Sequence, residues 1–156
     1  MKILICGGSK SGKSAFAERI ALRLPSPHYY VATMIATDEE DRDRIRRHKG
    51  RRSGLSFQTV EQGRDLTRAL EQRDREGTFL VEAMTSLLAN EMFCSGSYDP
   101  EAGERVREDL ETFLREAENV VLVFDNLYAD TTKLDEGSES FRRALAQLQI
   151  CAAKSC

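Results

Sequence analysis

The chain has 156 residues, 31% of them charged, and its 23 Lys and Arg against 26 Asp and Glu leave a net charge of -3. The length predicts a single domain, and the near balance of charges argues against a nucleic-acid-binding protein, so we expect small-molecule partners. The four cysteines form no Cys-x-x-Cys pair and no apolar run is long enough for a membrane span, which argues against zinc and disulfide motifs and favours a cytoplasmic protein.

The chain begins with a predicted buried strand over Lys2 to Cys6 and continues into a glycine-rich loop. The loop reads G-x-x-x-x-G-K-S and consists of Gly7, Gly8, Ser9, Lys10, Ser11, Gly12, Lys13 and Ser14. In such a P-loop, backbone N–H groups turn toward phosphate oxygens, the lysine reaches the β- and γ-phosphates, and the serine can hold Mg²⁺. A helix over Lys13 to Leu24 completes the required strand-loop-helix context. The sequence therefore predicts a site for a nucleoside triphosphate.

A second strand is expected over His28 to Thr33, followed by an unusual helix over Asp38 to Lys49. The helix is acidic at its start and basic at its end, which matches the helix dipole. Ile45 is its one strongly apolar residue, so the helix would pack poorly on a core. We expect it to lie exposed or over a cleft.

The rest of the chain alternates between apolar runs and charged or amphipathic segments. We predict strands over Phe57 to Val60, Thr78 to Glu82 and Val120 to Phe124, and helices over Asp65 to Arg75, Glu101 to Ala117 and Glu139 to Ala153. Met84 to Phe93 is partly apolar, and 95–100 and 125–137 are predicted loops. Strands that alternate with helices predict an α/β, P-loop NTPase-like fold of three layers with a mostly parallel central sheet.

Two carboxylates are candidates for Mg²⁺ beside Ser14, because a P-loop enzyme needs an acidic group at the end of a neighbouring strand. Asp125 follows the stronger apolar run and is favoured by a small margin from the pattern alone. Glu82 follows the run Phe79-Leu80-Val81. For either residue, the alternative is a strand-end carboxylate that faces solvent.

His48 stands near the end of the charged helix, among arginines and a lysine. Cations on every side disfavour the imidazolium form, and the neutral ring can act as a nucleophile or a base. The same cations would also hold a phosphate chain. From the pattern alone, a solvated basic helix face with one ordinary histidine is the simpler interpretation.

Together these residues resemble the bifunctional adenosylcobinamide kinase/adenosylcobinamide-phosphate guanylyltransferase family of cobalamin biosynthesis. The resemblance starts with Ile3 to Ser14 and Tyr30-Val31-Ala32-Thr33, and is most specific in Asp38-Glu39-Glu40, Arg44-Ile45, His48-Lys49 and Arg51-Arg52. It continues through Phe57 to Glu61, Leu80-Val81-Glu82 and Leu87 to Asn90.

The resemblance implies two transfers at one site. The P-loop would serve phosphoryl transfer from ATP or GTP to the aminopropanol hydroxyl of adenosylcobinamide. His48 would attack the α-phosphorus of GTP, release pyrophosphate and then pass GMP to adenosylcobinamide phosphate. The acidic role moves toward Glu82, with Asp125 second.

The resemblance also implies further ligands and an assembly. Nucleotide contacts are expected from Thr33, Arg51, Glu61 and Glu82, with Mg²⁺ as the cofactor. The corrinoid is the second substrate, and a homo-oligomer is implied, with a trimer as its expected form.

The C-terminal part departs from the family pattern. After the last predicted strand the family usually has Asn-Glu-x-Gly, whereas this chain has Asp125, Asn126, Leu127 and Tyr128. The last helix has Arg143, Ala146 and Gln149 where the family tends to Asp, Gly and Asn. Family members also continue into a closing strand, so we expect a C-terminally short domain over residues 1–156 whose sheet lacks that strand. These departures leave two alternatives open: a non-catalytic GTP-binding paralogue, and a P-loop kinase for another small alcohol.

Overall fold

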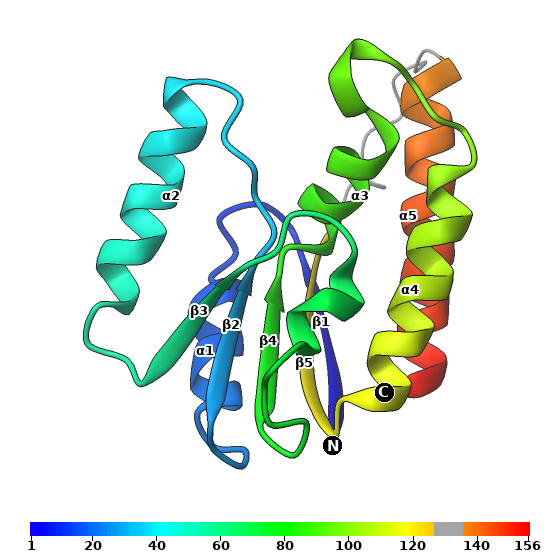
Figure 1. Cartoon of the computed structure of the whole chain (residues 1–156). Coiled ribbons are helices and arrows are strands. Elements are labelled where there is room, and N and C mark those ends of the chain that lie inside the picture. Colours follow the sequence, from blue (N-terminus) through cyan, green and yellow to red (C-terminus); the bar gives the residue numbers. More distant parts are fainter. Residues whose placement is uncertain (127–135) are drawn as a thin grey trace.

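Five strands form one parallel sheet in the computed structural model, which describes residues 1–126 and 136–156 (Figure 1). The strands are β1 (Lys2–Gly7), β2 (His28–Ala32), β3 (Phe57–Glu61), β4 (Thr78–Glu82) and β5 (Asn119–Asp125). Their order in the sheet is β1-β5-β4-β2-β3, and every neighbouring pair is parallel. The predicted α/β, P-loop NTPase-like fold is confirmed.

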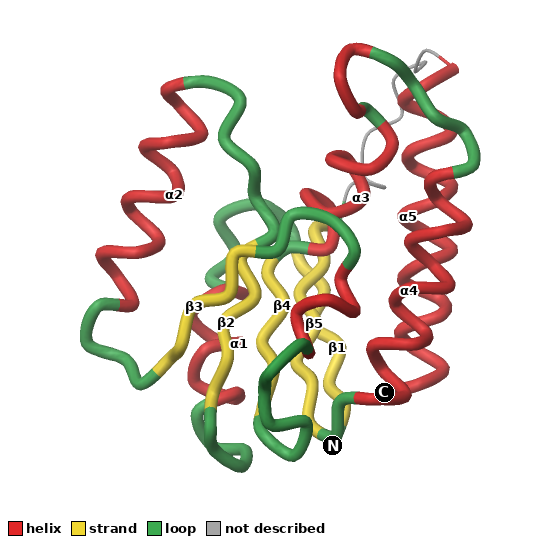
Figure 2. The backbone as a smooth tube through the Cα atoms, in the orientation of Figure 1, coloured by secondary structure: helices red, strands yellow, loops and turns green. Residues whose placement is uncertain are grey.

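Helices cover both faces of the sheet and make the outer two layers (Figure 2). They are α1 (Lys13–Ala21), α2 (Glu39–Arg52), α3 (Met84–Met92), α4 (Ala102–Glu116) and α5 (Glu136–Ser155), with short 3₁₀ helices η1 (Leu66–Leu70) and η2 (Cys94–Gly96). Helix α1 lies on one face, and α3, α4 and α5 lie on the other, while α2 rises beside β2 and β3 away from the other helices (Figure 1). No helix in the described ranges is long and apolar enough to cross a membrane.

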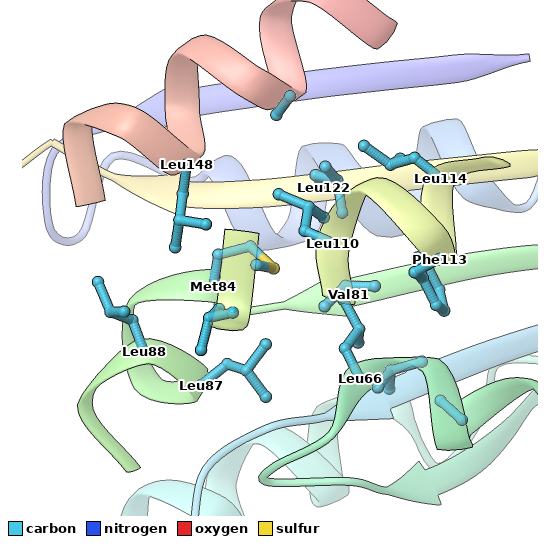
Figure 3. Packing of buried hydrophobic residues seen from close by; sticks show 14 of the residues in the cluster. Leu66, Val81, Met84, Leu87, Leu88, Leu110, Phe113, Leu114, Leu122 and Leu148 are labelled. Atoms are coloured by element: carbon cyan, nitrogen blue, oxygen red, sulfur yellow. The ribbon is translucent and has the colours of Figure 1, made fainter. Parts of the chain in front are cut away.

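The central strands are buried because apolar side chains leave them in both directions. On β5, Val121 and Val123 pack toward α1, while Leu122 packs toward α3 and α4. The larger of the two clusters is shown in Figure 3, where Leu122 lies among side chains such as Leu110 and Met84. A strand covered on both faces reads as one continuous apolar run, and this explains the strong signal of residues 120–124.

The prediction of a helix over 65–75 is wrong, because the structure has only the 3₁₀ helix Leu66–Leu70 there. Left-handed residues stand on both sides of it, Asp65 at φ 47° and Gln72 at φ 57°, and interrupt a continuous helix. Thr67 donates its backbone N–H and its hydroxyl to an aspartate of α4, which ties the short turn to the core. Tertiary contacts have overridden local helix propensity here.

Other predicted boundaries move by a few residues. The first helix ends at Ala21, and the charged helix runs on through Gly50 to Arg52. Met84–Met92, for which the pattern predicted no definite element, is helix α3. Two positions that depart from the family pattern, Leu127 and Tyr128, lie outside the described residues.

Candidate functional site

The carboxyl ends of the five strands carry the candidate residues to one edge of the sheet. In the strand register Gly7 lies opposite Asp125, and Ala32 lies opposite Glu82. Because parallel strands end at the same edge, residues far apart in the sequence become neighbours there. Ligands in open α/β sheets bind at this edge, so the P-loop at the end of β1 stands where a nucleotide is expected.

The P-loop is a tight turn that enters α1. Gly12 precedes the helix with φ 84°, a conformation that a side chain would strain. The Lys13 ammonium donates to the Gly8 carbonyl at 3.0 Å and pairs with the Asp125 carboxylate at 2.5 Å. Most of the surface of both charged side chains is buried. The lysine is thereby held at the loop mouth, where phosphate oxygens would replace its present partners.

Glu82 is the acidic centre of the site. Its carboxylate accepts a hydrogen bond from the Ser14 hydroxyl on one oxygen and from the Tyr30 hydroxyl, at 3.0 Å, on the other. Thr33 supports the same strand end, because its hydroxyl donates to the Ala83 carbonyl at 2.7 Å and its N–H donates to the Glu82 carbonyl. Two side chains therefore hold the carboxylate at the entrance of α1.

The hydroxyl of Ser14 and the carboxylate of Glu82 fit Mg²⁺ as hard oxygen ligands. In the described part of the chain, no three His, Cys, Asp or Glu side chains gather into a metal-binding group. In nucleotide enzymes one or two protein oxygens commonly bind Mg²⁺, and phosphates and water complete the octahedron. Asp125 lies in the same cavity but is paired with Lys13, so Glu82 is the better placed of the two candidates.

Helix α2 begins with a well-formed cap. The Asp38 carboxylate accepts from the Asp41 N–H at 2.8 Å, and the Asp41 carboxylate accepts from the Thr37 hydroxyl at 2.8 Å. The hydrogen bonds from Thr37 lower the pKa of Asp41. These contacts start the helix although it covers little of the core, as its apolar-poor sequence predicts.

A cavity of about 720 Å³ lies between the P-loop and α2. It is lined by P-loop residues from Ser9 to Ser14, by Glu82 and Asp125, and by Glu40, Arg44, Arg47 and His48 from α2. This volume is within the range of small-molecule sites. The structure thus brings His48 into the same cavity as the phosphate-binding loop.

A second cavity of about 490 Å³ adjoins the first and shares Arg44, His48 and Glu82 with it. Tyr30, Arg52 and Glu61 also line it. The Lys49 ammonium lies 2.8 Å from a Glu61 oxygen and links α2 to the end of β3, and this contact lowers the pKa of Glu61. The two cavities, which share lining residues, together form the candidate site.

The remaining predicted residues occupy different positions around this site. Thr33 is buried behind the strand end, and Gly7 and Gly8 form the turn at the end of β1. Arg51 belongs to the last turn of α2, and its side chain lies outside the described part.

Two residues of the site, Tyr30 and Arg52, were given no role in the sequence analysis. Arg52 lies with its guanidinium carbon 3.4 Å from the centre of the Tyr30 ring and is only 7% exposed. Its Nη1 atom is buried and has no hydrogen-bond partner among the described residues. Both residues stand inside the motifs that carry the resemblance, but nothing in the local pattern distinguishes a buried Arg52 from its charged neighbours.

Comparisons with known proteins identify relatives of this chain. The model of a family described as "Cobinamide kinase / cobinamide phosphate guanyltransferase" matches residues 3–156. The "Bifunctional adenosylcobalamin biosynthesis protein CobP" of Pseudomonas aeruginosa is 34% identical over 158 aligned positions, which span 100% of this chain and 89% of the relative. The "Bifunctional adenosylcobalamin biosynthesis protein CobU" of Salmonella typhimurium is 35% identical over 103 positions, 65% of this chain and 56% of the relative.

Proposed function

The chain belongs to the cobinamide kinase / cobinamide phosphate guanyltransferase family, and from this membership we propose that residues 1–156 form one domain with both activities. It would phosphorylate adenosylcobinamide with a nucleoside triphosphate and transfer GMP from GTP to adenosylcobinamide phosphate. One observation carries the proposal: His48 of α2 and the P-loop line the same cavity of about 720 Å³.

The guanylyl transfer proceeds in two substitutions at one phosphorus. A ring nitrogen of His48 forms a bond to the α-phosphorus of GTP, the bond to the bridging oxygen breaks, and pyrophosphate leaves. A phosphate oxygen of adenosylcobinamide phosphate then attacks the same phosphorus, and the nitrogen–phosphorus bond breaks. Arg44 and Arg47 line the cavity beside His48 and balance the charge of the triphosphate.

In this proposal Ser14 and Glu82 would hold Mg²⁺, which would neutralise charge on the phosphates. Lys13 turns from Asp125 to the β- and γ-phosphates. The second cavity takes the base and ribose, because it opens from the first beside His48. Glu61 lines that cavity from the end of β3, and its carboxylate can accept from the N–H groups of guanine.

Labelling with α-³²P GTP and Mg²⁺ tests the central step. We expect acid-labile label on the wild-type protein and none on His48→Ala. His28→Ala is the matched control, because His28 is the other histidine of the chain and its ring nitrogen contacts the Leu24 carbonyl, away from the site. His28→Ala should label like the wild type.

The alternatives give different results in the same experiment. Undiminished label on His48→Ala would overturn the histidine intermediate. Normal GTP binding with no label and no turnover of adenosylcobinamide would point to a non-catalytic GTP-binding paralogue. Phosphoryl transfer that is equal in the wild type and in His48→Ala, with no covalent label on the wild type either, would point to a P-loop kinase for another small alcohol.

The family resemblance also implies a homo-oligomer, and the sequence pattern predicts a cytoplasmic location. Light scattering of the purified protein measures the first, and fractionation of cells that express it measures the second. A trimer is the expected assembly.

A further inference from the structure

Tyr30 contacts both halves of the site at once. It lies on β2, is 3% exposed, and donates its hydroxyl to the Glu82 carboxylate at 3.0 Å. The face of its ring lies against the guanidinium of Arg52, 3.4 Å from the ring centre. Glu82 in turn accepts from Ser14 of the P-loop, and Arg52 ends α2. A single buried side chain therefore joins the strand end beside the P-loop to the helix that carries His48.

Arg52 is the anchor of α2. Among the α2 residues whose side chains are described, Arg52 is the buried one, and the others are exposed or half-buried. Arg52 follows His48 by one helical turn, so the two side chains share a face of the helix. The position of Arg52 on the Tyr30 ring therefore determines which way His48 faces.

The Tyr30 hydroxyl is suited to act as a permanent donor. Tyr30 is almost fully buried, and toward the acceptor-only carboxylate of Glu82 its hydroxyl can act only as a donor. With Ser14 on one carboxylate oxygen and Tyr30 on the other, the orientation of Glu82 is determined before a nucleotide arrives. The ring face, which needs no proton, attracts the guanidinium at the same time.

We propose that Tyr30 is a positioning residue with two contacts. Its hydroxyl orients Glu82 at the P-loop, and its ring holds α2, and with it His48, in position. The inference rests on the proposed function, because it deepens the roles given there to Glu82 and His48. Its two halves are separable, since the hydroxyl and the ring can be removed one at a time.

The hydroxyl is tested with Tyr30→Phe by the Mg²⁺ dependence of GTP binding. We expect the Mg²⁺ concentration for half-maximal binding to rise about tenfold, as for other groups that orient a metal ligand. Tyr29→Phe is the matched control: Tyr29 is a buried neighbour on β2 whose hydroxyl accepts from the Asp74 N–H outside the site. An unchanged Mg²⁺ midpoint in Tyr30→Phe would overturn this half of the proposal.

The ring is tested by amide hydrogen exchange of α2 in Tyr30→Leu and Arg52→Met. The amides of α2 should exchange faster in both variants than in the wild type. They should exchange at the wild-type rate in Tyr30→Phe, which keeps the ring. Arg47→Met is the control, because it removes an exposed arginine from the same helix. Arg52→Met keeps the test valid if Tyr30→Leu does not fold. Unchanged α2 exchange in Arg52→Met would overturn the anchor.

Neither measurement requires guanylyl transfer. If the wild type forms no labelled enzyme, the proposed function fails. The Mg²⁺ midpoint for GTP binding and the amide exchange rates of α2 still test the role of Tyr30 in that case. If the wild type is labelled and the Tyr30 variants behave as the wild type in both assays, the function stands and this inference fails.

Discussion

Glu82 and Asp125 look alike in the sequence, since each ends an apolar strand, yet they have different partners in the structure. Glu82 accepts from two hydroxyls, while Asp125 pairs with the ammonium of Lys13. A carboxylate between hydroxyls is available to a cation, and one that neutralises a lysine is less so. We therefore assign them separate roles.

Substitution separates these two roles. Glu82→Gln should raise the Mg²⁺ concentration for half-maximal GTP binding about tenfold or more, because it removes a charged metal ligand. Asp125→Asn should leave that midpoint within about twofold, because the Ser14 hydroxyl, the other proposed Mg²⁺ ligand, contacts Glu82 while Asp125 contacts Lys13. Nucleotide binding titrated with Mg²⁺ measures both. The reverse order would transfer the metal role to Asp125.

The raised pKa of Tyr30 predicts a loss of stability in base. An unfolded tyrosine ionises near pH 10, so above about pH 10 the unfolded chain gives up a proton that the folded protein keeps. The free energy of unfolding should therefore fall with rising pH, by up to about 1.4 kcal/mol per pH unit more in the wild type than in Tyr30→Phe. Urea unfolding between about pH 9 and 11 measures the difference. Equal slopes would contradict it.

At the scale of elements, α2 differs from every other helix. It carries charge along its whole length, and it is held by the Asp38 cap at its start and by Arg52 at its end. A helix with so little core contact depends on its caps more than a buried helix does. This matters for function because His48 lies between the two attachments.

Removal of the cap should loosen the start of α2 without unfolding the protein. Asp38→Ala is expected to cost the helix about 1 kcal/mol and to speed exchange of its first amides roughly fivefold. Asp43→Ala is the control, since it removes an exposed carboxylate from the same helix but no cap. Hydrogen exchange measures both. Equal protection in the two variants would show that the cap does not start the helix.

At the scale of the whole molecule, stability comes from the sheet and the helices on its two faces. Leu122 lies on the central strand β5 and is fully buried, whereas Ile150 of α5 is 56% exposed. The two side chains have the same number of carbon atoms, so truncating each of them compares a buried position with an exposed one. The fold tolerates a core-poor α2 because its core lies elsewhere, around β4 and β5.

Truncation of these two side chains tests where the core lies. Leu122→Ala should lower the free energy of unfolding by about 2 to 5 kcal/mol through lost burial and a cavity. Ile150→Ala should change it by about 0.5 kcal/mol or less. Chemical denaturation of both variants gives the comparison. A cost for Ile150→Ala near that of Leu122→Ala would mean that this face is covered in solution.

Much of the fold could be predicted from the sequence because its signals are local. The apolar run 120–124 and the glycine-rich loop each have one physical explanation, and both stand where they were predicted. The segment 65–75 was predicted wrongly, because a contact from Thr67 to α4 and two left-handed residues decide its conformation. Such contacts leave no trace in a periodic pattern.

The P-loop, the alternation of strands and helices, and the family can all be identified from the sequence, since they depend on residue types at fixed spacings. The folded chain was needed to show that Glu82 contacts Ser14, that His48 lines the P-loop cavity, and that Arg52 is buried against Tyr30. The reason is physical: strand order and register bring distant residues to one edge of the sheet, and burial is a property of that assembly.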